Sequence, residues 1–430
     1  MNQQVIEQGK RKTLNITAIA IALMGVCSLL TGVAPQMILS IGILIGSVLL
    51  FLDGNLYLGY PFVMFYYELY GRLFGLSVYR IYTLLLLFLA LLSLVRGKGI
   101  RLKYLPVLIV YFFYTIAVML PISPQRAIFS FVDIICCMFL IVAFITQDEK
   151  KLKSFFRVYV LVAVLAFVTG LIGGNTMVYE EIVGESAEIT RYMATFEDPN
   201  YMGYFYTSAI FALVVLKLFH PKLRFLLVIA LYLMILSTVS MTAIVVNVAL
   251  WLFYLFLMKK MNIRAFAVSL IVVALFVGFY RYGLTNPDAA IWGSMSMRIE
   301  EKLLELNRGD IGAVTTGRTD LSAEHLAYFT ESSFLKKLFG GTAINTSFVD
   351  PALSGAAHNE YIDWLLNIGL LGTLIMAGFL IYSFFGYWKK AVKEKNDVYA
   401  FLAMIKANWM FYAATLTIFL DFRFMLLFFI

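Results

Sequence analysis

The stretch Ala357-His358-Asn359-Glu360-Tyr361-Ile362-Asp363-Trp364 joins the longest polar run of the chain to a strongly apolar segment. It carries a histidine, an asparagine and two carboxylates at the point where a helix should begin. The apolar segment, Tyr361–Tyr387, exceeds the roughly 20 residues that a helix needs to cross a bilayer. We therefore predict a transmembrane helix with chemically active side chains at its mouth.

Apolar segments of similar length recur along the whole chain. The 430 residues are 62% hydrophobic and 14% charged, whereas soluble domains are nearer half apolar and about a quarter charged. A bilayer forces such segments into helices, because each backbone amide must find its partner within the segment. The composition predicts an all-α, polytopic integral membrane protein of about 12–13 transmembrane helices. We expect a single membrane domain over residues 1–430, with a large, partly helical external loop.

The basic residues predict how the chain is oriented. The net charge of +8 comes from lysines and arginines in short loops between apolar segments, which is typical of cytoplasmic loops and does not indicate a nucleic-acid partner. Counting spans from these loops puts two polar segments, 173–200 and 281–360, on the outer face. The aromatic-rich segment Leu56–Gly75 is then expected to be a short or re-entrant span. The predicted location is the cell membrane, with an active site that faces outward.

The sequence contains no pattern typical of a metal or cofactor site. The cysteines Cys27, Cys136 and Cys137 lie inside apolar segments and lack the spacing of zinc ligands. Neither a Walker motif nor an internal repeat is present. We expect no metal and no cofactor.

Among the three histidines, His358 has the best position for catalysis. The N-terminal dipole of the helix that follows disfavours the imidazolium, so the ring should be neutral and able to accept a proton. A plain helix cap with a solvated histidine is the alternative. His220 lies among basic residues at the end of a span, and His325 lies inside an expected amphipathic helix, where a surface or packing role is expected.

Three arginines in the external segments are candidates for binding phosphate. Arg191 stands in the first segment, and Arg298 and Arg318 stand in the second. Arginine suits phosphate because its planar fork holds two oxygens at once and keeps its charge. A salt bridge to a nearby glutamate is the alternative for Arg191.

Local signals place these arginines beside expected helices. Asp198 or Asn200 can cap a helix that begins at Tyr201. In the large loop, Met297–Asn307 is expected to form an amphipathic helix and Leu321–Phe329 a second helix.

The histidine stretch resembles a motif of the O-antigen ligases and the related polysaccharide polymerases. His358-Asn359, then nine residues, then Gly369, two more residues and Gly372 fit that family's His-(Asn/Ser/Gln)-x9-Gly-xx-(Gly/Thr/Tyr) pattern.

Two further motifs strengthen this resemblance. Arg191 with Asp198-Pro199-Asn200 resembles the family's Arg…Asp-Pro-Asn segment, and Gly317-Arg318 resembles the Gly-Arg that opens a helix in its large outer loop. The motifs extend over residues 190–385 in the family's order. One motif departs from the pattern: the segment Ser237–Thr242 has Met241 where the family often has the arginine of a Ser-Arg pair.

The resemblance implies a metal-independent, inverting glycosyltransferase of the cell membrane in bacteria, whose donor is a glycan on undecaprenyl pyrophosphate. Carried over to this chain, Arg191 and Arg318 would bind the donor pyrophosphate and stabilise the leaving charge. His358 would be the base that activates the acceptor hydroxyl, and Arg298 is a weaker phosphate candidate. The remaining candidates for substrate binding belong to the same motifs: Asp198, Asn200, Asn359 and Glu360.

Several functions remain open at this stage. The leading hypothesis is a polymerase of repeat units for a surface polysaccharide such as a capsule or an O-antigen. A ligase would instead transfer the same glycan to a lipid or cell-wall acceptor. A transporter of lipid-linked sugars and a non-catalytic membrane scaffold are the alternatives from other classes. Expected partners are the lipid-linked donor, a glycan or lipid acceptor, membrane lipids and other polysaccharide-assembly proteins.

Overall fold

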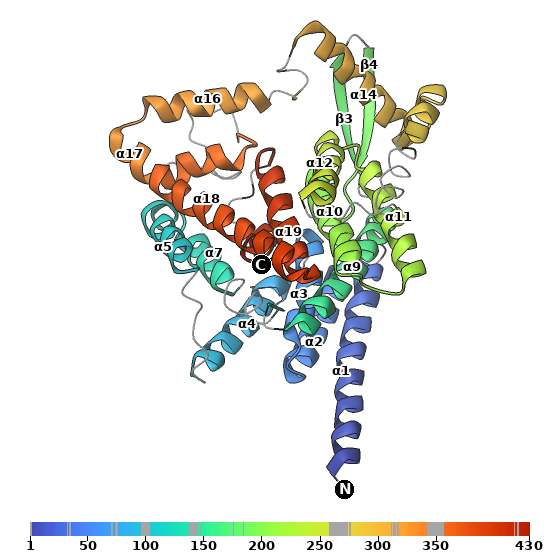
Figure 1. Ribbon diagram of the computed structural model, residues 1–430, viewed down its shortest axis with the longest axis vertical. Helices are drawn as coiled ribbons and strands as arrows, with labels where there is room; N and C mark the ends of the chain where they lie inside the picture. The colour runs from blue at the N-terminus through green and yellow to red at the C-terminus, as the bar shows by residue number, and fades with distance from the viewer. Residues whose placement is uncertain are drawn as a thin grey trace. The chain divides into compact units, whose positions relative to one another are not determined.

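Helices dominate the part of the chain that the computed structural model describes (Figure 1). The described residues are 2–31, 33, 36–69, 72–73, 76–95, 104–136, 145–146, 148–174, 176–183, 185–257, 274, 277–310, 312, 315, 318–341, 357–416, 418 and 421–430. The prediction of a mainly helical protein is confirmed. Gly317, most of the predicted span at 265–280 and the polar stretch 342–356 lie outside these residues.

The chain forms two units. Unit 1 comprises Met1–Gly99, Phe139–Met177 and Arg191–Thr238, and unit 2 comprises Ile100–Met138, Val178–Thr190 and Val239–Ile430. Both units contain apolar helices, and each contains segments that are distant in the sequence.

Unit 1 is built from long helices with a short broken segment between them. Its elements are α1 (Asn2–Leu30), α2 (Gln36–Leu52), η1 (Leu56–Gly59), α3 (Tyr60–Phe65), η2 (Tyr67–Leu69), β1 (Arg72–Leu73), β2 (Leu76–Ser77), α4 (Val78–Val95), α9 (Glu149–Gly173), α10 (Pro199–Val215) and α11 (Pro221–Ser237). An aromatic cluster at the centre of the unit joins three of them: the ring of Phe65 lies 5.1 Å from Tyr159, 5.5 Å from Phe196 and 5.6 Å from Phe205. The cluster holds the turn before α10 against α3 and α9.

The aromatic-rich segment after α2 is not a continuous helix. Its helical part, α3, has six residues, which extend about 9 Å at helical rise and fall far short of a bilayer. Pro61 lies in its first turn, and Tyr66 ends the helix with non-helical backbone angles. All residues from Leu56 to Tyr66 are buried, so the segment fills the interior of unit 1.

The first predicted external segment contains strands that the sequence did not lead us to expect. Residues Thr176–Val183 and Glu185–Tyr192 form β3 and β4 of a two-stranded sheet. The β4 strand ends one residue after Arg191, so this arginine stands at the base of the hairpin.

Unit 2 contains the helices of the second predicted external segment and of the C-terminal part. Its elements are α5 (Leu105–Tyr114), the π-helix η4 (Thr115–Met119), α6 (Leu120–Ile122), α7 (Pro124–Cys136), α12 (Met241–Leu257), α14 (Ala290–Arg308), α16 (Arg318–Glu331), α17 (Phe334–Phe339), α18 (Glu360–Glu394), α19 (Asp397–Ala413) and α20 (Phe422–Phe429). The two helices expected in the large loop are therefore present, and both are longer than predicted: α14 starts seven residues before Met297, and α16 starts at Arg318.

Helices α18 and α19 lie side by side in unit 2 (Figure 1). The rings of Trp364 and Trp409 stack between them with 5.5 Å between centroids. The short helix α20 is buried against α19 and α7, and its eight residues are too few to cross a bilayer.

Two described helices, α9 and α18, are long and apolar enough to cross a membrane. Shorter apolar helices of 10–17 residues accompany them, among them α2 and α12. The larger number of spans, the orientation and the single membrane domain remain predictions.

Helix α18 is interrupted at Gly369, the glycine of the histidine motif. Its φ of 67° and ψ of −176° are non-helical, a conformation that costs little only for glycine. The end of α17 fits into this break, where the Gly341 amide donates to the Asn367 carbonyl over 3.2 Å. A Cβ atom on Gly369 would collide with the backbone of Gly340, and one on Gly340 would collide with the Asn367 carbonyl. The two glycines therefore allow backbone-to-backbone contact between α17 and α18.

Replacing Gly369 by alanine should destabilise unit 2 by about 1–3 kcal/mol, because the substitution adds backbone strain and forces α17 away. Gly378→Ala in the same helix is the matched control, since a Cβ atom there meets nothing within 4 Å. Thermal unfolding of the detergent-solubilised protein compares the two variants. Equal melting temperatures for both would show that the break does not hold α17.

Candidate functional site

The start of α18 has an unusual backbone at the predicted catalytic histidine. His358 is half-buried and has a φ of 50°, a left-handed conformation that is uncommon for a residue with a side chain. The next residue, Asn359, caps the helix: its Oδ1 accepts hydrogen bonds from the amides of Tyr361 at 3.1 Å and Ile362 at 3.4 Å. The cap fixes where the helix begins, so His358 is held immediately outside the N-terminus.

Helix α16 brings the predicted phosphate ligand Arg318 to the same place. The Ser322 hydroxyl donates to the carbonyl of Ala357 over 3.3 Å, directly beside His358. Arg318 lies one helical turn before Ser322 and therefore on the same face of α16. Its Nη1 donates to the Thr415 carbonyl over 3.1 Å. This hydrogen bond orients the Arg318 guanidinium.

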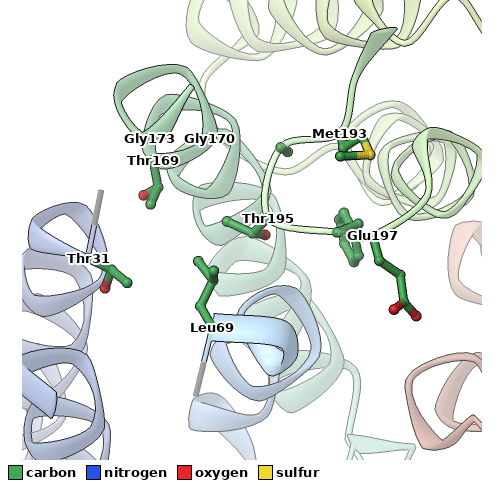
Figure 2. A pocket seen from close by; sticks show the side chains of 10 residues that line it. Thr31, Leu69, Thr169, Gly170, Gly173, Met193, Thr195 and Glu197 are labelled. Carbon is green, nitrogen blue, oxygen red and sulfur yellow. The ribbon is translucent and has the colours of Figure 1, made fainter. Parts of the chain in front are cut away.

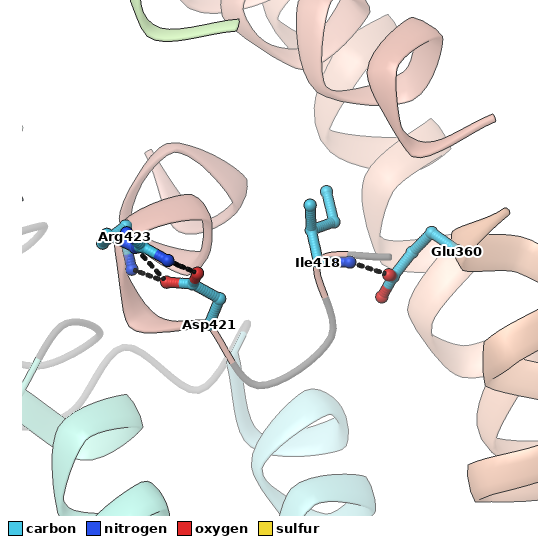
Figure 3. Close-up of polar contacts among 4 residues, drawn as sticks. All are labelled: Glu360, Ile418, Asp421 and Arg423. Carbon is cyan, nitrogen blue, oxygen red and sulfur yellow. Dashed lines mark hydrogen bonds and ion pairs between the residues drawn. The ribbon is translucent and has the colours of Figure 1, made fainter. Parts of the chain in front are cut away.

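The segment after α19 completes this arrangement through Glu360 (Figure 3). Glu360 is fully buried, and its Oε2 accepts a hydrogen bond from the Ile418 amide over 2.6 Å. The same segment carries Thr415, which accepts from Arg318. A carboxylate that binds the backbone in this way positions a chain segment. Glu360 therefore helps to hold the Thr415 carbonyl, which accepts the hydrogen bond from Arg318, in place.

The other end of that segment is fixed by Asp421 and Arg423 (Figure 3). Asp421 caps α20 by accepting from the Arg423 amide at 2.9 Å. The Arg423 guanidinium also binds both carboxylate oxygens of Asp421, with Nε lying 2.9 and 3.0 Å from them. A bidentate pair of this kind is geometrically specific, so it fixes the start of α20, while Glu360 holds the backbone at Ile418.

We call Arg318, Ser322, Ala357–Glu360, Thr415 and Ile418 the α16–α18 cluster. It brings together four of the predicted site residues: Arg318, His358, Asn359 and Glu360. Behind it, Asp363 and Asn367 are fully buried, and the Asn367 side-chain amide donates to the Asp363 carbonyl over 2.8 Å. The cluster therefore has a polar, ordered foundation within the apolar helix pair.

Arg298, the remaining candidate in unit 2, lies outside this cluster, and His325 has the packing role that the sequence predicted. Arg298 is in the middle of α14, where it is largely buried. Its Nε has no hydrogen-bond partner among the described residues. His325 is fully buried in α16, and its Nδ1 lies 2.7 Å from the Leu321 carbonyl, so its position is that of a packing residue.

Arg191 belongs to unit 1 and is buried at the base of the hairpin. Its Nε donates to the Thr238 carbonyl over 2.9 Å. Thr238 stands at the C-terminal end of α11, three positions before Met241.

Asp198 and Asn200 lie at the N-terminus of α10. The Asp198 carboxylate accepts from the Asn200 amide over 2.6 Å, which makes Asp198 the cap of the helix. Asn200 is buried in the first turn beside Pro199. Both residues therefore have structural partners at this helix start.

A cavity of about 520 Å³ lies beside this turn in unit 1 (Figure 2). The turn Met193–Glu197 forms one side, and Thr169, Gly170 and Gly173 of α9 form another. Glu197 is its charged lining residue, and neither lysine nor arginine lines it. The size is that of a small-ligand site, and the lining suits hydroxyl donors better than a phosphate.

Sequence reasoning identified the histidine and the arginine of the cluster but missed their supports. Thr415 and Ile418 carry no motif, and they act through backbone atoms. Arg318 and Thr415 are separated by 97 positions, and Glu360 and Ile418 by 58. No local signal can reveal such contacts. Among the described ranges, no group of three or more His, Cys, Asp or Glu side chains is arranged to hold a metal ion.

No protein-family model matches this sequence, and no curated protein is found to be similar to it.

Replacing Glu360 by alanine should lower the stability of unit 2 by about 1–3 kcal/mol, because a buried amide at Ile418 loses its acceptor. Glu360→Gln keeps an oxygen that can accept and should lose less. Glu394→Ala, at the exposed end of the same helix, is the matched control. In thermal unfolding, the melting temperature should be lowest for Glu360→Ala, higher for Glu360→Gln and highest for Glu394→Ala. A Glu360→Ala protein as stable as the control would contradict the positioning role.

Proposed function

We propose that this protein is a membrane glycosyltransferase that polymerises lipid-linked oligosaccharide repeat units into a surface polysaccharide. The observation that carries the proposal is the convergence of Arg318 and His358 at the start of α18. These two residues were selected from separate motifs 40 positions apart in the sequence. A base and a guanidinium on two contacting elements are the groups that transfer from a pyrophosphate donor requires.

In the proposed reaction, His358 is the general base. It takes the proton of an acceptor hydroxyl as the hydroxyl oxygen attacks the anomeric carbon of the donor sugar. The bond between that carbon and the pyrophosphate oxygen breaks, and its electron pair leaves with the lipid pyrophosphate. Because attack and departure occur on opposite faces, the anomeric configuration inverts. The α18 dipole supports the neutral imidazole that this step requires.

Arg318 is proposed to stabilise the charge that develops on the leaving pyrophosphate. Its guanidinium has five N–H groups in a planar fork, and the bond from Nη1 to the Thr415 carbonyl fixes the orientation of that fork. Arg191 is proposed as a second phosphate ligand on the strength of its sequence motif, and Arg298 as a weaker one.

Membrane residence is part of the proposal. Helices α9 and α18 have the length and apolarity of spans, and the composition extends this character along the chain. We propose a multi-pass protein of about 12–13 spans in the plasma or inner membrane of a bacterium, with the α16–α18 cluster facing outward. There it would meet a donor such as glycan-linked undecaprenyl pyrophosphate.

Purified protein incubated with a lipid-linked repeat unit tests the reaction class. A ladder of products supports the polymerase. Transfer that requires a second lipid or cell-wall acceptor would favour the ligase, which uses the same donor. Movement of the intact lipid-linked glycan across vesicles without transfer would contradict the proposal and identify a transporter.

His358→Ala should reduce polymer formation about 10²–10⁴-fold, which is the usual contribution of a general base. The protein should still accumulate in the membrane. His220→Ala is the control, because His220 is exposed and its side chain makes no cap bond. Polymer formed by His358→Ala at the rate of the control variant would exclude His358 as the base.

Arg318→Lys should be nearly as damaging as Arg318→Ala, with a loss of about 10²-fold or more in transfer rate. Lysine supplies a point charge but cannot bond to the Thr415 carbonyl and a phosphate with the same fixed fork. Arg308→Lys, at the exposed end of α14, is the matched control. Full transfer by Arg318→Lys would mean that charge alone acts at this position.

A further inference from the structure

Helix α17 presents an apolar face that stays exposed among the residues of unit 2 that the structure describes. Phe334, Leu335 and Phe339 are 74%, 66% and 60% exposed. At 100° per residue these three side chains lie within one 140° arc of the helix, and Lys336 and Lys337 lie outside that arc. Leaving a large apolar side chain in water is unfavourable relative to burying it. Three such side chains on a six-residue helix therefore indicate that water is not its surroundings.

The way α17 is attached explains why this face stays open. The helix docks through backbone, with Gly340 and Gly341 against Asn367 and the break at Gly369. Its large side chains are not needed for that contact. The neighbouring helix α16 makes the side-chain contact instead, because Tyr328 and Phe329 pack on Leu366 of α18.

The end of α17 contacts α18 at Asn367–Gly369, and the exposed apolar surface of α18 begins directly after this contact. Directly after Gly369, Leu370, Leu371 and Leu374 are also exposed. Before Gly369, Glu360, Asp363 and Asn367 are buried polar residues. The break therefore separates the part of α18 that contains these buried polar residues from an apolar part that is long enough to cross a bilayer. Helix α17 lies at the boundary.

We propose that α17 is an in-plane membrane anchor that inserts Phe334, Leu335 and Phe339 into the outer leaflet. The proposal rests on the membrane placement in the proposed function. An amphipathic helix with aromatic and leucine residues on one face and lysines on the other is suited to the interface. Lys336 and Lys337 would bind the phosphates of anionic lipid headgroups.

The anchor would also set the distance of the α16–α18 cluster from the bilayer. Glu360 and Gly369 are nine positions apart, which is about 14 Å at helical rise. The headgroup layer on each side of a bilayer is roughly 5–8 Å thick. The cluster then stands just beyond the headgroups, where the pyrophosphate and the first sugar of a lipid-linked donor emerge.

Spin labels on single cysteines test the anchor in vesicles of phosphatidylethanolamine and phosphatidylglycerol. The native cysteines are replaced, and labels are placed at Phe339→Cys and, as a second variant, Leu335→Cys. Leu374→Cys on α18 is the lipid control, and Ala327→Cys on the exposed face of α16 is the aqueous control. Accessibility to oxygen and to a water-soluble nickel chelate reports the surroundings of each label.

Labels at 339 and 335 should match the lipid control, with high oxygen and low nickel accessibility. The Lys336→Gln/Lys337→Gln double variant should shift them toward the aqueous values in anionic vesicles. High nickel accessibility at 339 and 335 would overturn the proposal, and protection from both reagents would do so too, since it would mean that a protein or a second copy covers the face.

The two controls separate this proposal from the proposed function. An aqueous signal at Leu374→Cys would reject the membrane placement itself. If the label at Leu374→Cys is exposed to lipid and the label at Phe339→Cys is exposed to water, the anchor is rejected and the membrane placement is kept. Lipid exposure at both positions in a protein that forms no polymer would retain the anchor and reject the glycosyltransferase.

Discussion

The hydrogen bond from the Ile418 amide to the buried carboxylate of Glu360 is the contact on which the rest of the cluster depends. It ties the segment after α19 to the first turn of α18, and it thereby places the Thr415 carbonyl that orients Arg318. A buried carboxylate is costly to leave without partners. The fold meets this demand with a backbone amide, and the position of His358 follows from the same helix start.

Gly369, the first glycine of the histidine motif, has a structural role beside the chemical role that is proposed for His358. Gly369 breaks α18 and admits the backbone of α17. The histidine and the glycine of one sequence pattern thus mark the two ends of the same short helical stretch. In the proposed function, the histidine end carries the chemistry and the glycine end sets its distance from the lipid.

Much of the helical framework could be predicted from sequence because its signals are local. Apolar length predicts α9 and α18, and the caps at Asp198 and Asn359 follow from residue type and position. The β3–β4 hairpin was missed although its two strands contain β-branched and aromatic residues on either side of a glycine, because the segment was interpreted only as a polar external loop. The support of Arg318 by Thr415 was missed because it joins residues 97 positions apart through a backbone atom. Glu360 was a candidate ligand by its neighbours in sequence, and only its burial and its partner indicate a positioning role.

The central claim is that each glycosidic bond is formed at the expense of one lipid pyrophosphate linkage. Counting both products in one reaction tests it most directly: the bonds formed, from the length distribution of the glycan, and the free undecaprenyl pyrophosphate released by the wild-type protein. The account predicts one lipid pyrophosphate per bond, with inverted configuration at the new linkage. Release without bond formation, or transfer with retained configuration, would contradict it.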